Sequence, residues 1–208
     1  MDNWLVYQMT RGQLHITDTS NATRTMLYNS HKRTWDTTLL EAMQLPREIL
    51  PEVRPSSHVY GLTNPAAMLD VESPIASMAG DQQAALFGWA CFIPRMAKHT
   101  YGTGGFLLLH TGTTPVPSLI GLPTTVAWDR GERTEYALEV SVFMAGAALQ
   151  WLRDGLQVLA SSETSEAIAA EVSDVHGVYL VSAFVGLGAP HWDPHARGTI
   201  IGLTRDVN

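Results

Sequence analysis

Short apolar segments separated by turn-forming residues occupy the middle of this chain, and they restrict its fold more than any other feature. Met96–Tyr101 and Phe106–Thr111 flank a glycine-rich turn, and Thr124–Trp128 and Thr134–Glu139 flank a second turn at Asp129–Glu132. Apolar runs of this length, bounded by glycine and polar residues, are typical of strands joined as hairpins. The sequence therefore predicts a sheet in this region.

Helical patterns precede and follow these strands. Asp36–Met43 predicts a short helix that Pro46 closes, and Asp81–Phe92 predicts a helix that follows a strand at Ile75–Ala79. Apolar residues recur at three- and four-residue spacing in Ser141–Val158, which predicts the longest helix of the chain.

Weaker patterns fill the remaining stretches. We expect an apolar element at Trp4–Tyr7, strands at Val59–Leu62 and Val178–Ala183, a loop at Thr63–Pro74 and a helix at Glu166–Val172. Because strands, a hairpin and helices alternate along the chain, the sequence favours a mixed α/β fold.

Composition limits the class of protein. With 208 residues, of which 45% are apolar and 16% charged, the chain can bury the core of one large domain or of parts of two. The net charge is -7 and no cluster of Lys and Arg offsets it, which argues against a nucleic-acid partner. The apolar stretches are too short to span a bilayer.

The ends of the chain and its cysteine content bear on its origin. Cys91 is the only cysteine, so no internal disulfide can form, and a reducing cytoplasm fits. The N-terminus lacks the basic and apolar regions of a signal peptide. The apolar element at Trp4 begins with almost no residues before it, and the last residues, Gly202–Asn208, form a turn directly after a strand. We therefore expect a fragment cut at both ends.

Asp81 stands where a buried strand gives way to a helix. Taken alone, an acidic residue there is best explained as a helix N-cap, whose carboxylate accepts a backbone N–H. The alternative is a general base that takes a proton from a substrate hydroxyl, a role that typically contributes ~10²–10⁴ in rate.

Thr100–Phe106 is rich in glycine and lies between two apolar segments. Taken alone, it is best explained as a tight hairpin turn with glycines at positive φ. The alternative is an anion loop, in which Gly102 and Gly104 let the backbone approach a phosphate and Thr103 adds a hydroxyl donor. No Gly-Lys-Ser/Thr follows, so this is not a Walker loop.

Two further stretches carry weaker signals. Gly146 falls within the long helical pattern, where glycine costs ~1 kcal/mol against alanine, so either close packing or a nucleotide resting on the helix would explain it. In Gly186–Pro194 and the residue after it, His191 and His195 lie beside prolines and have no Cys or Glu near them. We therefore prefer a structural loop there to a metal site.

Together these stretches closely resemble the FGGY family of carbohydrate kinases, and within it the branch that phosphorylates glycerol. The resemblance covers essentially the whole chain. It is carried by Thr17–Leu27, Leu50–Arg54, Ala79–Gly88, Thr100–Gly104, Gly146–Arg153 and Gly186–Leu203.

The resemblance implies an actin-like, ribonuclease H-like fold of two α/β domains. Residues 1–90 would be the C-terminal part of the first domain and residues 91–208 the N-terminal part of the second, with the boundary near Ala90 to Pro94. The implied reaction is ATP-dependent phosphorylation of glycerol to sn-glycerol 3-phosphate, with Mg²⁺ accompanying ATP. The implied partners are glycerol and ATP, and a homo-oligomer is open for the whole protein.

The resemblance also implies roles for particular residues. Asp81 would be the base that deprotonates glycerol, with Gln82 beside it and Phe106 packed against the glycerol carbon chain. ATP would be contacted by Thr103, Gly104, Gly146 and Gln150. No Mg²⁺ ligand can be assigned beyond the neighbourhood of Asp81.

The chain departs from the family in two ways that matter here. The N-terminal phosphate loop and the Arg-Glu pair that grips glycerol would lie before Met1, so we expect the isolated chain to be inactive. Gly105 stands where the family usually has a side chain, often Cys, which would loosen the turn. Two alternatives stay open: another FGGY polyol or sugar kinase, and a non-catalytic nucleotide-binding remnant.

Overall fold

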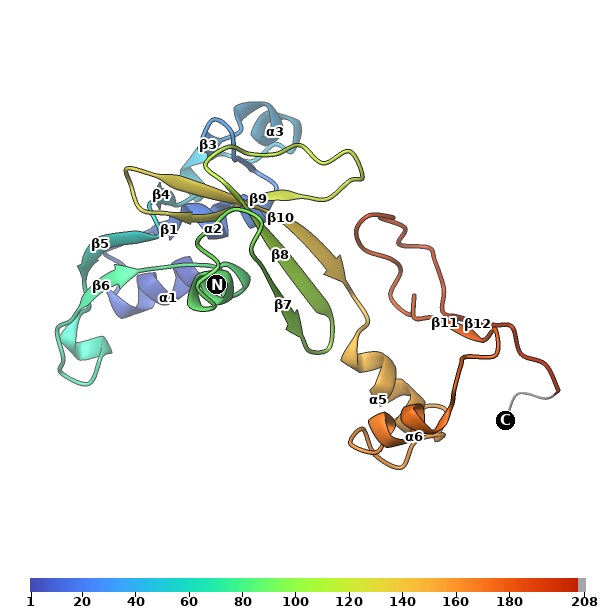
Figure 1. Ribbon diagram of the computed structural model, residues 1–208. Coiled ribbons are helices and arrows are strands. Elements are labelled where there is room, and N and C mark those ends of the chain that lie inside the picture. The colour runs from blue at the N-terminus through green and yellow to red at the C-terminus, as the bar shows by residue number, and fades with distance from the viewer. Residues whose placement is uncertain (206–208) are drawn as a thin grey trace. The chain divides into compact units, whose positions relative to one another are not determined.

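The computed structural model describes residues 1–205 (Figure 1), and the chain forms two compact units. The turn expected at the end of the chain extends into residues 206–208, which lie outside the described residues. Unit 1 is made of Met1–Lys98, Leu108–Ser118 and Thr124–Glu139, and unit 2 is made of His99–Leu107, Leu119–Pro123 and Val140–Asn208.

Unit 1 holds most of the regular structure. Its α-helices are α1 (Asp2–Met9), α2 (Thr19–Ala22), α3 (Thr37–Ala42) and α4 (Asp81–Gly88), and its 3₁₀ helices are η1 (Thr23–Thr25), η2 (Arg47–Ile49) and η3 (Pro65–Ala67). Its strands are β1 (Ile16–Asp18), β2 (Tyr28–Asn29), β3 (Thr34–Trp35), β4 (Glu52–Arg54), β5 (Ser57–Leu62), β6 (Pro74–Ser77) and β9 (Thr124–Asp129).

The strands of the N-terminal half pair two by two. β1 runs parallel to β4, whereas β2 with β3 and β5 with β6 are antiparallel. Two small apolar cores lie beside them: Val6, Ile16, Tyr60 and Ile75 form one, and Ala22, Tyr28, Trp35 and Leu40 form the other. The apolar element expected at Trp4–Tyr7 is part of helix α1, which contributes Val6 to the first core.

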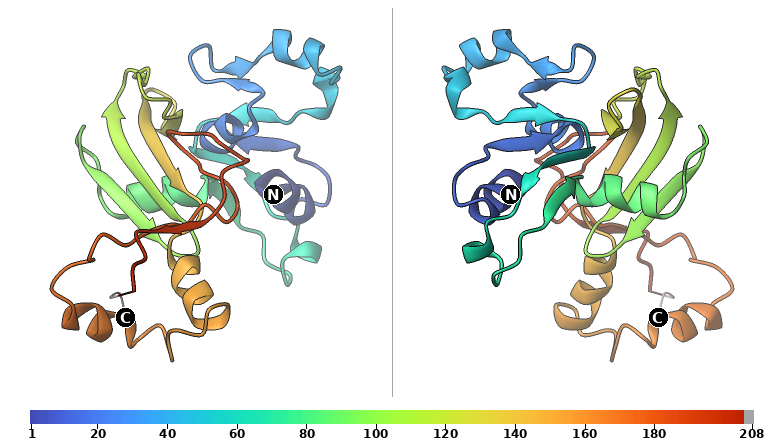
Figure 2. Two further views of the ribbon diagram at one scale, coloured as in Figure 1. Left: turned by 90° about the vertical axis from the view of Figure 1, so that its right-hand side faces the viewer. Right: turned by 90° about the vertical axis from the view of Figure 1, so that its left-hand side faces the viewer.

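A four-stranded sheet follows, in the order β7-β8-β10-β9, and Figure 2 shows its green and yellow strands side by side. β7 (Ala97–Tyr101), β8 (Gly105–Gly112) and β10 (Thr134–Val142) each begin in one unit and end in the other. β9 and β10 form the predicted hairpin, with Thr134 opposite Asp129 and a register shift between Glu135 and Tyr136. In unit 1 this sheet and α4 bury a third core that contains Leu86, Cys91, Leu108, Ala127, Trp128 and Ala137.

Unit 2 contains α5 (Gly146–Asp154), α6 (Ser165–Glu171), β11 (Tyr179–Val181) and β12 (Thr199–Ile201), the last two paired antiparallel. The Trp151 ring of α5 packs against the Phe184 ring, with the centroids 4.5 Å apart and the planes tilted by 45°. The loop expected at Gly186–Pro194 is closed on itself, because Leu187 and Asp193 exchange backbone hydrogen bonds at 2.8 and 3.1 Å.

Two helices are shorter than the sequence predicts. The helix expected over Asp81–Phe92 ends at Gly88, and Ala90 takes a left-handed backbone (φ 55). The helix expected over Ser141–Val158 spans only Gly146–Asp154. At its start, Ser141 and Val142 belong to β10, and beyond its end Gln157 is left-handed (φ 58).

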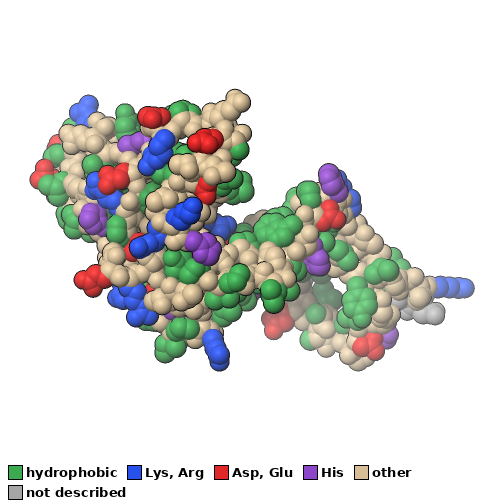
Figure 3. Space-filling model, turned by 90° about the horizontal axis from the view of Figure 1, so that it is seen from above, with side chains coloured by type: hydrophobic (Ala, Val, Ile, Leu, Met, Phe, Trp, Pro, Cys, Tyr) green, Lys and Arg blue, Asp and Glu red, His purple; other side chains and the backbone are tan. Residues whose placement is uncertain are grey.

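Charged side chains of both signs are interspersed on the face shown in Figure 3. No helix among residues 1–205 is long and apolar enough to cross a membrane.

Candidate functional site

Asp81 is the first residue of α4, directly after the turn that follows β6. The N-cap position belongs to Gly80, and no side chain caps the helix, so the capping role considered for Asp81 is wrong. The Asp81 side chain is exposed instead. Its two carboxylate oxygens accept hydrogen bonds from Gln82, Oδ1 from the backbone N–H at 2.8 Å and Oδ2 from the side-chain amide at 3.3 Å.

Buried polar side chains hold the segment that carries Asp81, and the sequence did not single them out. The Gly80 N–H donates to the Ser20 hydroxyl at 2.9 Å, although 60 positions separate the two residues. Gln83, on the buried side of α4, donates to the Thr125 hydroxyl at 3.3 Å. These contacts fix α4 to α2 on one side and to β9 on the other.

Asp18 is the centre of the same polar layer. It is fully buried at the end of β1, where it caps α2 by accepting from the backbone N–H groups of Ser20 and Asn21 at 2.9 and 3.0 Å. It also accepts from the Asn21 side chain at 2.8 Å and from the Ser56 hydroxyl at 2.6 Å. Asp followed by Thr-Ser-Asn after a strand is a capping signal that sequence reasoning could have used.

Lys98 is a second residue that sequence reasoning missed. It lies on β7, is only 5% exposed, and donates a hydrogen bond from Nζ to the Gln82 side-chain oxygen. Burial lowers the pKa of Lys98, while the charges of Asp81, Glu139 and Cys91 act in the opposite direction. A buried ammonium group is unusual unless it is paired. The position of Lys98 beside Gln82 and Asp81 therefore suggests a specific role for it.

In unit 2 the glycine-rich turn is joined to the start of α5. The Gly146 N–H donates to the Gly102 carbonyl at 2.8 Å, and the N–H groups of Ala145 and Ala147 donate to the Thr103 carbonyl at 2.9 and 3.2 Å. We had expected Gly146 in the middle of a helix. It is instead the first residue of α5. The turn carbonyls take the place of a side-chain cap, which α5 lacks.

In this turn Gly104 and Gly105 allow close approach of neighbouring groups, and none of its glycines supplies an unusual backbone angle. Gly102, Gly104 and Gly105 all avoid positive φ, so the prediction of positive φ is wrong. A β-carbon on Gly104 would stand 2.7 Å from the Val142 carbonyl oxygen, and one on Gly146 would stand 2.6 Å from the Gly102 carbonyl oxygen. Within residues 1–205, no acceptor is recorded for the backbone N–H groups of Thr103 and Gly104.

The other predicted residues of unit 2 lie on either side of this turn. The Phe106 ring packs near Gly104, and Gln150 is exposed on α5 one turn after Gly146, on the same side of the helix. A β-carbon on Gly105 would stand 2.9 Å from Nε2 of His99, so the His99 ring occupies the space that a side chain at position 105 would need.

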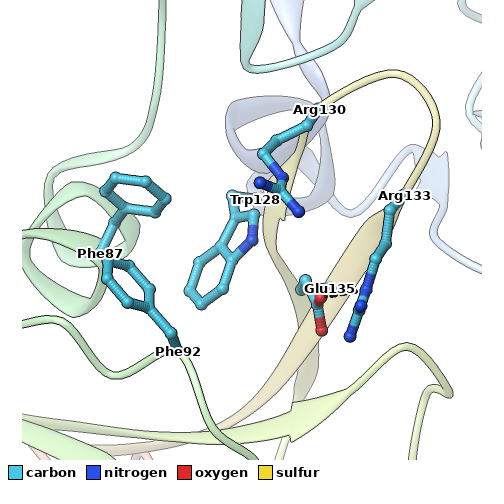
Figure 4. Close-up of a pocket in the computed structure, with 6 residues that line it drawn as sticks. All are labelled: Phe87, Phe92, Trp128, Arg130, Arg133 and Glu135. Carbon is cyan, nitrogen blue, oxygen red and sulfur yellow. Dashed lines mark ion pairs between the residues drawn. The ribbon is translucent and has the colours of Figure 1, made fainter.

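Asp81 lines neither of the two cavities beside α4. One, of about 340 Å³, is bounded by Ser56, Met78, Gln83 and Ala127 among others. The other, of about 280 Å³, has Phe87, Phe92 and Trp128 on one wall and Arg130, Arg133 and Glu135 on the other (Figure 4). Glu135 is 3% exposed and paired with Arg133 at 2.5 Å and His110 at 3.0 Å.

Residues 1–205 contain no group of three or more His, Cys, Asp or Glu side chains that could hold a metal ion by themselves. A Mg²⁺ ion that enters with a nucleotide is held largely by phosphate oxygens and water and needs only one or two carboxylates. The exposed Asp81 carboxylate meets that lesser requirement, whereas Asp18 is fully used as a cap.

Profiles of two neighbouring domains match the chain. The N-terminal domain of the FGGY family of carbohydrate kinases matches residues 1–88, and the C-terminal domain of the same family matches residues 97–208.

Individual relatives match almost from end to end. A glycerol kinase of Thermoanaerobacter sp. (strain X514) is 58% identical over 99% of this chain, and one of Trichlorobacter lovleyi is 60% identical over the same share. In both cases the match covers 41% of the relative. The chain thus spans about two fifths of the length of these relatives.

Solved structures agree with the sequence matches. A Plasmodium falciparum glycerol kinase with ADP superposes with a TM-score of 0.86 at 34% identity, over 99% of this chain and 41% of that one. A xylulose kinase from Rhodospirillum rubrum gives 0.78 at 21% identity, over 99% and 42%, which bears on the fold alone. The expected α/β fold of the actin-like, ribonuclease H-like type is confirmed.

Proposed function

We propose that this chain, which belongs to the FGGY family of carbohydrate kinases, is the central portion of an enzyme that phosphorylates glycerol with ATP. The relatives that match it along 99% of its length are glycerol kinases, which supports glycerol over other sugars and polyols. We place the boundary between its two domains near Ala90 to Pro94, between the stretches that the two profiles match.

Asp81 is the base of the proposed reaction. Its exposed carboxylate is held in one orientation by Gln82, and this is the observation that carries the proposal. Asp81 takes the proton of a terminal glycerol hydroxyl as that oxygen bonds to the γ-phosphorus of ATP. The bond from the γ-phosphorus to the bridging oxygen breaks, and sn-glycerol 3-phosphate and ADP leave.

The turn at Thr103 positions phosphate. Backbone N–H groups without a protein acceptor are suited to anionic oxygens, and those of Thr103 and Gly104 have none recorded within residues 1–205. Gly146 and Gln150 share one side of α5 and accompany the nucleotide, while Phe106 offers an apolar face to the glycerol carbons. Mg²⁺ bound with ATP neutralises charge on the phosphates.

The deciding experiment uses the complete polypeptide that contains this segment. Glycerol-dependent ADP release should be measured for the unsubstituted protein and for Asp81→Asn, which keeps the shape of the side chain but removes the base. We expect a loss of ~10²–10⁴ in kcat, and urea unfolding should show that Asp81→Asn is still folded under the assay conditions. Equal activity of the two proteins would refute the assignment of the base.

Two alternatives are tested alongside. A panel of polyols and pentuloses separates glycerol from other substrates of the family, and preference for a pentulose would replace glycerol as the substrate. Calorimetry with ATP analogues, read beside the phosphoryl-transfer assay, separates an enzyme from a nucleotide-binding remnant. Nucleotide binding without any transfer by the complete protein would favour the remnant. We expect the isolated 208-residue chain to be inactive and the complete protein to work in the cytoplasm.

A further inference from the structure

We propose that Lys98 is a positioning residue for Asp81, acting through the side-chain amide of Gln82. The inference rests on the proposed function in one respect, namely that Asp81 is the base of the reaction. The Lys98–Gln82–Asp81 connection itself belongs to unit 1 and is independent of that assignment.

The connection fixes which way the Gln82 amide points. A lysine ammonium group has three donors and no acceptor, so it can bind only the oxygen of a neighbouring amide. Lys98 Nζ donates to Oε1 of Gln82, which leaves the NH₂ group to donate to Oδ2 of Asp81 at 3.3 Å. Without Lys98, Oε1 of Gln82 loses this donor, and the amide is free to swing away from the carboxylate.

Burying the ammonium group of Lys98 costs free energy, so the surrounding side chains must compensate for it. Burial disfavours the ammonium form, and the carboxylates of Asp81 and Glu139 offset part of that penalty. Glu139 is itself 2% exposed, and its carboxylate accepts hydrogen bonds from both terminal nitrogens of Arg24, at 2.5 and 3.0 Å. Arg24 thus fixes the position of Glu139, whose charge favours the ammonium form of Lys98. Gln82 connects Lys98 to the exposed carboxylate of Asp81.

The same arrangement suits the chemistry expected of Asp81. A base is effective when its reactive oxygen is held in one orientation, because misplacement by about 1 Å can cost ~10² in rate. Oδ1 accepts from the Gln82 backbone N–H at 2.8 Å, and among the described residues Oδ2 accepts only from the Gln82 side-chain amide. Lys98 therefore stabilises the contact of Asp81 that a change in the Gln82 rotamer can break.

The first test needs no enzymatic activity and uses the 208-residue chain. Nuclear magnetic resonance of the chain labelled with ¹³C and ¹⁵N gives the Asp81 carboxyl resonance and the Gln82 side-chain NH₂ resonances, with Asp81→Asn and Gln82→Leu to assign them. In Lys98→Met, which keeps the length and removes the charge, we expect both sets to shift. Lys32→Met, which removes the same charge from an exposed turn, should shift neither.

The second test is kinetic and uses the complete polypeptide. We expect Lys98→Met to lower kcat by about tenfold and to leave KM for ATP within about twofold, because ground-state nucleotide contacts are untouched. Lys98→Arg, which restores the charge and the donors, should recover at least part of the lost rate. Lys32→Met should match the unsubstituted protein, and urea unfolding should show that each variant is folded.

The two tests separate the possible failures. If Lys98→Met folds and leaves the Asp81 and Gln82 resonances in place, the inference is wrong whatever the enzyme does. If the resonances shift but kcat does not, Lys98 orders the carboxylate without serving the reaction, and the inference fails in its functional part. If the complete polypeptide phosphorylates no polyol, the proposed function fails, and the resonance shifts alone decide whether Lys98 positions Asp81.

Discussion

Gly146 lies against Gly102 so closely that a β-carbon on Gly146 would stand 2.6 Å from the Gly102 carbonyl oxygen. The substitution Gly146→Ala has two opposite effects on the free energy of unfolding. Helix propensity favours alanine by at most ~1 kcal/mol, the value for a helix interior, and Gly146 is the first residue of α5. The clash falls on backbone, which cannot move aside like a flexible side chain, and overpacking of this kind costs about 1–3 kcal/mol.

We therefore expect Gly146→Ala to lower the urea midpoint. The matched control is Gly88→Ala at the last residue of α4, where a β-carbon meets nothing within 4 Å and where alanine should leave stability unchanged or raise it. Stabilisation by both substitutions would show that α5 can move away from the turn freely.

Two adjacent glycines of the turn should differ in tolerance. A β-carbon at Gly105 meets the far end of the His99 side chain at 2.9 Å, and that ring can rotate away. A β-carbon at Gly104 meets the Val142 backbone carbonyl at 2.7 Å, which cannot. We expect Gly105→Ala to cost less than about 1 kcal/mol and Gly104→Ala to cost more, as measured by urea unfolding. Equal costs would contradict this account.

Asp18→Ala should be among the most damaging single substitutions in unit 1. It removes the fully buried acceptor of four hydrogen bonds. The donors of Ser20, Asn21 and Ser56 are then left without an acceptor. We expect a loss of at least about 3 kcal/mol in the free energy of unfolding. Asp36→Ala, at the similar but solvent-accessible cap of α3, should cost clearly less. The comparison is made by urea denaturation with circular dichroism.

Stability should fall at alkaline pH through Tyr28. Burial raises the pKa of Tyr28 from 10.0 to about 12, with the Asp129 carboxylate adding to the effect. The folded state therefore holds the phenol proton more tightly than the unfolded state. This contribution is complete below pH 10 and is lost between pH 10 and 12, at up to about 1.4 kcal/mol per pH unit.

The measurement is the free energy of unfolding against pH. Tyr28→Phe should flatten the slope between pH 10 and 12, whereas Tyr7→Phe, at an exposed position of α1, should leave it unchanged. An unaltered slope in Tyr28→Phe would assign the alkaline loss to other groups, of which Tyr60 is the first candidate because burial raises its pKa too.

Local signals in the sequence were enough for most of the elements. The sequence offers Thr34 or Asp36 as the cap of α3, and the structure shows that it is Asp36. The turn at Asp129–Glu132 joins β9 to β10, as predicted. The predicted extent of the helix at Ser141–Val158 was wrong for a physical reason. Apolar spacing cannot distinguish a helix from the end of a strand, and Val142 is drawn into β10 by its partners in the sheet.

The site was predicted less completely than the fold. Asp81, Thr103 and Gly146 stand out because they interrupt regular patterns. Lys98 and Ser20 do not, because a lysine in a strand and a serine in a short helix look ordinary until tertiary contacts bury them. The capping role considered for Asp81 failed because Gly80 already takes the cap position.

The hydrogen bond from Gly80 to the Ser20 hydroxyl has a consequence for protein engineering. A donor segment that brings its own residues 74–88 will not seat correctly in a host whose residue 20 lacks a hydroxyl, however similar the two segments look by themselves. Shuffled libraries of this protein should therefore inherit residues 16–25 and 74–88 from one parent as a block. Recombination between these two blocks with a parent that lacks a hydroxyl at residue 20 should yield folded chains in which the Asp81 carboxylate is displaced.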